Sequence, residues 1–498
     1  MTALTRRLAG ALCAAVLLAG CTPARAPGPS GPSASAPAGD ARPNIVLVLT
    51  DDLSLNLVRF MPHVLALQRR GTTFTNATVT NSLCCPSRAS LLTGRYPHST
   101  GIFTNDGIDG GFVLFHRRGH ENSTFATDLQ QAGYRTALLG KYLNRYQPAN
   151  TLGTAAPYVP PGWSDWHVAG NGYAQFGYTL NENHVVRRYG HAPGDYLTDV
   201  LSARASAFIE ESAAARTPFL LEVATFAPHS PYTPAPRDAG AFPGLTAPRG
   251  PAFDALPADP PKWLADREPL TAGERARIDD TFRKRAQSVR SVDRLLAAVQ
   301  ATLARTGVAG NTVVVFTSDN GFHTGEYRLN PGKQTAFDTD VRVPLVIAGP
   351  NVGAGRTVAA PVQNIDLRPT FADLAGIPAP PQADGRSLTP LFAGPEPPWR
   401  TAALIEHHGP DADPTDPDRP RPGSGNPPSY AALRTPAYTY VEYVDGSREF
   451  YNRRVDPHQL RNIAAKLPPE RLAELHRALK ALTTCRADTC RTADRVTG

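Results

Sequence analysis

Short, continuously apolar segments alternate with longer amphipathic ones from residue 43 to about residue 395. Uninterrupted apolar runs such as NIVLVL at residues 44–49 are typical of strands that are buried on both faces of a parallel sheet. We predict strands of this kind at residues 44–49, 136–139, 219–224, 312–317 and 344–348. Amphipathic segments predict helices at residues 61–70, 124–132, 196–213, 270–306 and 366–375. The alternation indicates an α/β fold in which helices cover both faces of a mostly parallel sheet.

The pattern changes after residue 395, where polar and apolar positions alternate in short runs. Such alternation predicts antiparallel strands, and Asp445-Gly446 is a typical hairpin turn between two of them. We predict these strands at residues 403–407, 430–434, 437–444 and 449–452, followed by a closing helix at residues 468–482. The chain therefore divides into a main domain at residues 43–395 and a C-terminal subdomain at residues 396–498.

The N-terminus has the features of an export signal. Arg6 and Arg7 precede an apolar run at residues 8–18, which is too short to span a membrane stably. The run ends in LAGC, so we predict cleavage of residues 1–20 and lipidation of Cys21 at the outer surface of a bacterial membrane. The alternative is a plain signal peptide and a secreted protein. Residues 21–42 are rich in proline, serine and alanine, and form a tether that cannot build a core.

Composition adds two points to this picture. The 49 prolines and 41 glycines indicate long ordered loops, and we expect residues 142–195 and 230–268 to be irregular pocket walls. The formal net charge of +7 would become +5 without Arg6 and Arg7, an excess that favours polyanionic substrates. The simpler interpretation is a slightly basic, solvated surface. The sequence contains no nucleic-acid-binding module and no zinc-ligand spacing.

Polar residues follow several of the predicted strands directly. Asp51 and Asp52 follow the first strand, and Lys141, His229 and the pair Asp319-Asn320 follow later ones. Because ligands bind at the carboxyl ends of strands in open α/β sheets, we expect these side chains to converge on one site. The aspartates and the asparagine supply hard oxygen ligands, which favour Ca²⁺ or Mg²⁺ over zinc. Taken singly, each acidic pair is also compatible with a helix cap or a tight turn.

The segment CCPSRASLLTGRYPH at residues 84–98 carries the most specific chemistry. Pro86 favours a first helical turn, which places Cys84 at a helix N-terminus where an anion binds well. Arg88 lies one turn further along and can hold developing negative charge. Taken alone, Cys84-Cys85 is also compatible with a buried pair before an ordinary helix, and we interpret Cys85 as structural.

This segment resembles the signature of the type I sulfatases, and in particular their N-acetylglucosamine-6-sulfatase branch. The resemblance extends over most of residues 43–464 through the blocks TDD, GKYLN, APHSPY, TSDNGFHTGE, PGK, RVPLVIAGP, NIDLRPT and DGRSL. It implies an alkaline-phosphatase-like α/β catalytic domain with a smaller C-terminal antiparallel sheet. It further implies a maturation enzyme that oxidises Cys84 to formylglycine.

The resemblance also implies roles for individual residues. Hydrated formylglycine at position 84 would attack sulfur, expel the alcohol and then release sulfate as the aldehyde returns. One divalent cation, calcium rather than magnesium, would be bound by Asp51, Asp52, position 84, Asp319 and Asn320. Arg88 would stabilise charge, Lys141 and Lys333 would contact the sulfate, and His229 would protonate the leaving group.

The sequence departs from many arylsulfatases at one position. Lys141 is followed by Tyr142-Leu143-Asn144 rather than by a histidine two residues on, so the elimination base stays open. His323 and Asn144 are candidates for that space and for sugar contacts.

The main prediction is hydrolysis of 6-O-sulfated N-acetylglucosamine or a related sulfated glycan. A broad arylsulfatase, a phosphate or phosphonate ester hydrolase, and a non-catalytic glycan-binding lipoprotein are the alternatives. Cys485 and Cys490 are expected to form a disulfide in an oxidising compartment.

Overall fold

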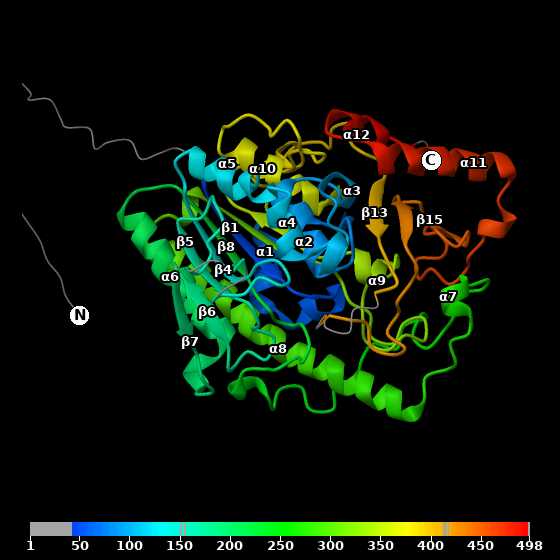
Figure 1. Cartoon of the computed structure of the whole chain (residues 1–498), viewed down its shortest axis with the longest axis horizontal. Coiled ribbons are helices and arrows are strands. Elements are labelled where there is room, and N and C mark those ends of the chain that lie inside the picture. The colour runs from blue at the N-terminus through cyan, green and yellow to red at the C-terminus, as the bar shows by residue number, and fades with distance from the viewer. Residues whose placement is uncertain (1–41, 150–151, 154–155, 412–415, 417, 497–498) are drawn as a thin grey trace, which may run out of the picture. The chain divides into compact units, whose positions relative to one another are not determined.

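A ten-stranded mixed sheet forms the centre of the fold, in the order β11-β2-β10-β9-β1-β8-β4-β5-β6-β7 (Figure 1). The computed structural model describes residues 42–149, 152–153, 156–411, 416 and 418–496. The predicted signal peptide, Cys21 and nearly all of the tether lie outside these residues. Four parallel strands are central and almost fully buried: β1 (Asn44–Thr50), β4 (Arg135–Lys141), β8 (Phe219–Ala224) and β9 (Thr312–Ser318).

Helices cover both faces of this sheet, which confirms the predicted α/β class. Alternate side chains of β1 point to opposite faces, so Ile45 and Leu47 belong to one core while Val46 and Val48 belong to the other. The first core is covered by α2 (Cys84–Thr93), α4 (Gly111–Arg117), α5 (Phe125–Gln131) and α10 (Leu367–Leu374). The second core is covered by α1 (Pro62–Arg70), α6 (Leu197–Ala214) and α8 (Ala272–Arg305).

Two features of the sheet differ from the sequence prediction. β10 (Leu345–Ala348) runs antiparallel to β9, whereas the sequence pattern predicted a parallel strand. The connection from β9 to β10 lacks the crossover helix that joins parallel neighbours, so the chain enters the sheet in the opposite direction. The stretch 142–195 is not wholly irregular, since it contributes β5 (Asp165–Ala169), β6 (Thr179–Glu182) and β7 (Val185–Arg188). These strands have at most five residues, so their periodicity is weak in the sequence.

Shorter elements complete the main domain. They are β2 (Thr72–Phe74), β3 (Ala77–Thr78), β11 (Arg356–Val358), β12 (Val362–Gln363), α3 (Pro97–Thr100), α7 (Lys262–Ala265) and α9 (Asp338–Val341).

A smaller antiparallel sheet follows, as predicted. Its strands are β13 (Ala403–His407), β14 (Tyr430–Arg434), β15 (Tyr438–Tyr443) and β16 (Arg448–Asn452). Helix α11 (Pro469–Thr484) packs on this sheet in a separate apolar core, and α12 (Asp488–Ala493) ends the described chain. Cys485 and Cys490 are joined in a disulfide beside that core, with an S–S distance of 1.98 Å. Among the described residues, no helix has the length and apolarity needed to cross a membrane.

Candidate active site

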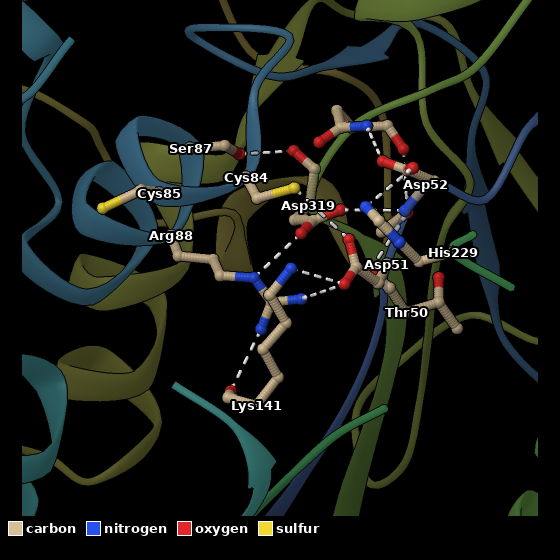
Figure 2. A network of polar contacts seen from close by, with 12 residues as sticks. Thr50, Asp51, Asp52, Cys84, Cys85, Ser87, Arg88, Lys141, His229 and Asp319 are labelled. Atoms are coloured by element: carbon tan, nitrogen blue, oxygen red, sulfur yellow. Dashed lines mark hydrogen bonds and ion pairs between the residues drawn. The ribbon is translucent and has the colours of Figure 1, made fainter. Parts of the chain in front are cut away.

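The carboxyl ends of the central strands bring the predicted polar residues together (Figure 2). Asp51 and Asp52 follow β1, Asp319 follows the adjacent β9, and Lys141 ends β4. Asp52 adopts a left-handed backbone conformation, with φ of 64°, and its N–H donates to Oδ1 of Asp319 at 3.1 Å. A strained non-glycine residue that is held by a neighbouring strand is typical of functional sites.

Cys84 is the first residue of α2 and is completely buried. Its sulfur points into the acidic cluster, whereas the sulfur of Cys85 points the opposite way, into the apolar core (Figure 2). Sγ of Cys84 lies 3.4 Å from Oδ1 of Asp51 and 2.8 Å from Nζ of Lys333. Burial and the nearby carboxylates of Asp418 and Asp51 raise the pKa of the Cys84 thiol well above its ordinary value. The thiol is therefore protonated at neutral pH.

Two buried lysines pair with the two aspartates after β1. Nζ of Lys141 lies 2.6 Å from Oδ2 of Asp51, and Nζ of Lys333 lies 2.8 Å from Oδ1 of Asp52. Burial alone would lower the pKa of both lysines, but the neighbouring carboxylates raise it well above the ordinary value. Burial likewise would raise the pKa of Asp51, but Lys141 and His229 hold it below its usual range. Both lysines are therefore charged, so the site presents two fixed ammonium groups to an incoming anion.

Arg88 connects helix α2 to the carboxyl ends of the central strands. Its Nε donates to Oδ2 of Asp319 at 2.8 Å, and its Nη1 donates to the carbonyl of Lys141 at 3.1 Å. Burial opposes its charge, but Asp319 and Asp51 raise the pKa of Arg88 above its ordinary value. Nη2 is buried, lies 4.0 Å from Oδ2 of Asp51 and has no hydrogen-bond partner among the described residues. One donor of the guanidinium is thus still available.

The acidic cluster fits a hard divalent cation. Oδ1 of Asn320 is buried without a hydrogen-bond partner in the described part of the chain, while its Nδ2 donates to Asp52 at 2.6 Å. One ligand atom from each of Asp51, Asp52, Cys84 and His229 lies within 4.8 Å of the others. Burial and the charge of Asp51 raise the pKa of Asp319 to about 6, as expected where carboxylates crowd together. Oxygen donors in this arrangement are typical of Ca²⁺ and Mg²⁺ sites.

His229 faces this cluster from the loop after β8, and its main partner is a residue that the sequence analysis missed. Its Nδ1 bonds to the carbonyl of Ser230 at 2.7 Å, and its Nε2 bonds to a carboxylate oxygen of Asp418. Burial opposes protonation, but Asp418 and the two aspartates after β1 raise the pKa of His229. The surrounding carboxylates therefore favour the protonated form of the imidazole.

The side chain of Asp418 is completely buried, although the residue belongs to the proline-rich loop between β13 and β14. It accepts hydrogen bonds from Nδ2 of Asn144 at 2.8 Å and Nδ2 of Asn105 at 3.2 Å, and it lies 3.8 Å from Nζ of Lys333. Burial alone would raise the pKa of Asp418, but Lys333 and His229 lower it well below the ordinary value. No pattern in the sequence distinguishes this aspartate from the other acidic residues of its loop, because only the fold brings it to the site.

His323 does not lie where the resemblance suggested. It is completely buried, its Nδ1 lies 2.9 Å from Asp340, and its Nε2 bonds to the carbonyl of Ser424 at 2.9 Å. Both ring nitrogens are therefore engaged within the protein, and His323 supports the loop that carries Lys333 instead of lining the pocket. Asn144, by contrast, is connected to the site, because its Nδ2 donates a hydrogen bond to Asp418.

Comparison with known proteins agrees with this geometry. Residues 43–377 match the sulfatase family, and residues 325–485 match the C-terminal family of N-sulphoglucosamine sulphohydrolase; the chain belongs to the sulfatase family and is a sulfuric ester hydrolase. Human N-acetylglucosamine-6-sulfatase is 36% identical over 483 residues, which cover 91% of this chain and 87% of the human protein. The predicted relationship to that branch is thereby confirmed.

Solved structures share the fold. One, described in complex with its substrate D-glucosamine-2-N,6-O-disulfate, has a TM-score of 0.74 at 23% identity and covers 91% of this chain and 99% of its own. A phosphonate monoester hydrolase of Agrobacterium radiobacter has a TM-score of 0.67 at 22% identity, with 89% and 96% coverage. At these identities the likeness extends to the architecture alone.

Proposed function

We propose that this sulfatase removes the 6-O-sulfate of N-acetylglucosamine residues in sulfated glycans, with formylglycine at position 84 as its nucleophile. The observation that carries the proposal is the position of Cys84, at a buried helix N-terminus between an acidic cluster and Lys333. The similarity to human N-acetylglucosamine-6-sulfatase along nearly the whole chain supports the choice of substrate.

The residues around position 84 suit a tetrahedral anion. Lys141 and Lys333 supply two buried positive charges, and the free Nη2 of Arg88 supplies a further donor. Hydrated formylglycine would supply an oxygen nucleophile, and a divalent cation, Ca²⁺ more than Mg²⁺, would supply Lewis-acid polarisation of the sulfate when bound. Asp51, Asp52, Asp319 and Asn320 would hold that cation, and the crowding of their carboxylates and the unbonded amide oxygen of Asn320 support this assignment.

His229 would donate the proton that the leaving sugar oxygen needs. Nearby carboxylates raise the pKa of its imidazole, which lines the pocket together with Ser230 and Tyr232. Asp418 orients the ring through Nε2, and the leaving oxygen would take the place of Asp418 beside Nε2, because Nδ1 is held by the carbonyl of Ser230. A sugar alkoxide is a poor leaving group, so this proton is more important for a glycan than for an aryl sulfate.

The experiment is a comparison of kcat/KM for 6-sulfated N-acetylglucosamine, for the 3- and 4-sulfated isomers, for an aryl sulfate and for a phosphonate monoester. The 6-sulfated sugar is expected to be the best substrate. Preference for the aryl ester or the phosphonate would show that the protein is not a glycan sulfatase. Preference for another isomer would show that the hydrolysed sulfate is at position 3 or 4 of the sugar.

We also propose that the mature protein is tethered outside the cell through lipidated Cys21 and is activated by a formylglycine-generating enzyme. The LAGC sequence before a proline-rich tether supports the first point, and the Cys84-x-Pro86-x-Arg88 pattern supports the second. Replacing Cys21 with alanine is expected to release the protein from the membrane fraction while the turnover number stays the same. Retention of the C21A variant in membranes would contradict lipid anchoring.

A further inference from the structure

A cleft of about 600 Å³ opens beside the catalytic pocket. The catalytic pocket itself measures about 60 Å³ and is lined by Asp52, His229, Lys333 and Asp418. The two cavities share four lining residues, namely Ser230, Tyr232, Pro331 and Arg421. The cleft therefore begins at the side of the pocket where His229 faces the leaving group.

Cations outnumber acidic residues among the side chains that line this cleft. Helix α8 contributes Arg277 and Lys284, and the loop between β13 and β14 contributes Arg421. The one acidic lining residue, Asp280, is already balanced, because Lys284 contacts it at 2.8 Å and Arg283 at 3.1 Å. The cleft consequently carries surplus positive charge beside a site that takes an anionic ester.

The wall between the two cavities has a strained residue. Tyr232 has a φ of 64°, a left-handed conformation that is unfavourable for a bulky residue. Its ring is also close to Arg285, whose guanidinium carbon lies 5.8 Å from the ring centroid. A partly exposed aromatic ring that is fixed at the junction of two cavities gives a rigid surface for a sugar. Asn330 also lines the cleft, and while its Nδ2 donates to Glu274 at 3.2 Å, its amide oxygen can accept from a hydroxyl group.

We infer that this cleft binds the sugar that adjoins the sulfated residue, and that its cations select a negatively charged neighbour. The inference rests on the proposed function and narrows its substrate class to acidic oligosaccharides. The negative charge can be a hexuronate carboxylate or a second sulfate, since both are recognised by arginine and lysine.

The test compares the R277Q/K284Q enzyme with wild type on four substrates. These are the 6-sulfated N-acetylglucosamine monosaccharide and disaccharides in which it is joined to a neutral hexose, a hexuronate or a sulfated hexose. The matched control is R69Q/R70Q, which removes the same charge from the exposed end of α1 and touches neither cavity. Neither variant alters a residue of the catalytic machinery.

Wild type is expected to prefer the acidic disaccharides over the neutral one. R277Q/K284Q should lose about fivefold in kcat/KM on the acidic disaccharides, mostly through KM and more at low salt, because two partly screened charges are removed. Its activity on the monosaccharide and the neutral disaccharide should change less than twofold, and the control should match wild type on all four. Comparison of the hexuronate disaccharide with the sulfated-hexose disaccharide shows which anion the cleft prefers.

Equal losses on all four substrates, or no wild-type preference for an acidic neighbour, would overturn the inference. Absence of turnover on every 6-sulfated sugar would instead overturn the proposed function. In that case the cleft is tested through inhibition of aryl sulfate hydrolysis by the acidic disaccharides. The inhibition constant should rise about fivefold in R277Q/K284Q, for the same electrostatic reason, and an unchanged constant would refute the cleft as an anion site.

Discussion

The ammonium of Lys333 lies 2.8 Å from the sulfur of Cys84 and the same distance from Oδ1 of Asp52. One lysine thus bridges the nucleophile position and the acidic cluster, across 249 residues of sequence. A positive charge at this point favours a deprotonated oxygen at position 84 and the sulfate that it attacks.

We predict that the peptide containing residue 84 carries an aldehyde when the protein is made with a maturation enzyme. Mass spectrometry of the tryptic peptide measures this directly. C84A should abolish turnover with an unchanged melting temperature, because one small buried residue replaces another. Full activity in a preparation whose peptide carries only the thiol would refute the formylglycine assignment.

Divalent metal is expected to bind and stabilise the site. Adding Ca²⁺ to chelated enzyme should raise the melting temperature, because it compensates the buried carboxylates of Asp51, Asp52 and Asp319. D319A should lose this thermal shift and about 10²–10³-fold in kcat, a loss typical of removing one electrostatic contact to the transition state. R69Q/R70Q serves as the folding control. A full calcium shift in D319A would exclude Asp319 as a ligand.

His229 and Asp418 are predicted to act as a pair. H229A should lose about 10²-fold or more on a 6-sulfated sugar, the usual size of a general acid contribution, and much less on an aryl sulfate. D418N should show the same substrate dependence, because its role is to hold the imidazole through Nε2.

The double variant H229A/D418N distinguishes a joint role of the two residues from independent roles. If Asp418 acts through His229, the losses in H229A/D418N should fall short of the sum of the single losses in free energy, by about 0.5–3 kcal/mol. Strictly additive losses would assign Asp418 a separate function, such as a direct sugar contact.

Glu222 is expected to make stability depend on pH. It lies in β8, burial raises its pKa to about 7, and its Oε2 has no hydrogen-bond partner among the described residues. The native state therefore keeps a proton that the unfolded state releases near its ordinary pKa, so the free energy of unfolding falls as pH rises through the interval from about 4.5 to 7.

E222Q replaces the charged form by a neutral one of similar shape. Compared with E222Q, wild type should lose on the order of 3 kcal/mol between pH 4 and pH 8, since each pKa unit corresponds to about 1.4 kcal/mol. Urea unfolding at the two pH values measures this difference. An identical pH dependence in both proteins would show that Glu222 does not titrate in this range.

The central part of this protein was predictable from its sequence. The four buried parallel strands are long apolar runs. Both faces of such a strand are apolar, so both faces are buried. Residues directly after such strands, such as Asp51 and Asp319, must lie at one edge of the sheet. Pro86 lies in the first turn of α2, where its missing N–H costs no helical hydrogen bond, so a helix start near Cys84 is compatible with local chemistry.

Tertiary structure decided the parts that depend on long-range packing. The short strands β5, β6 and β7 have weak periodicity of their own and are stabilised by pairing with β4 and with one another. His323 shares a sequence block with Asp319, yet its partner Asp340 turns it away from the pocket.

The position of Asp418 and the formation of the basic cleft also depend on tertiary structure. Both depend on a loop from the C-terminal subdomain that folds back against α8 and the loop after β8. No local pattern encodes such a contact, because its stability comes from charges such as Lys333 and His229 that are distant in the sequence. The sequence by itself therefore determined the family and the residues after the central strands, and the tertiary structure determined which distant residues surround them.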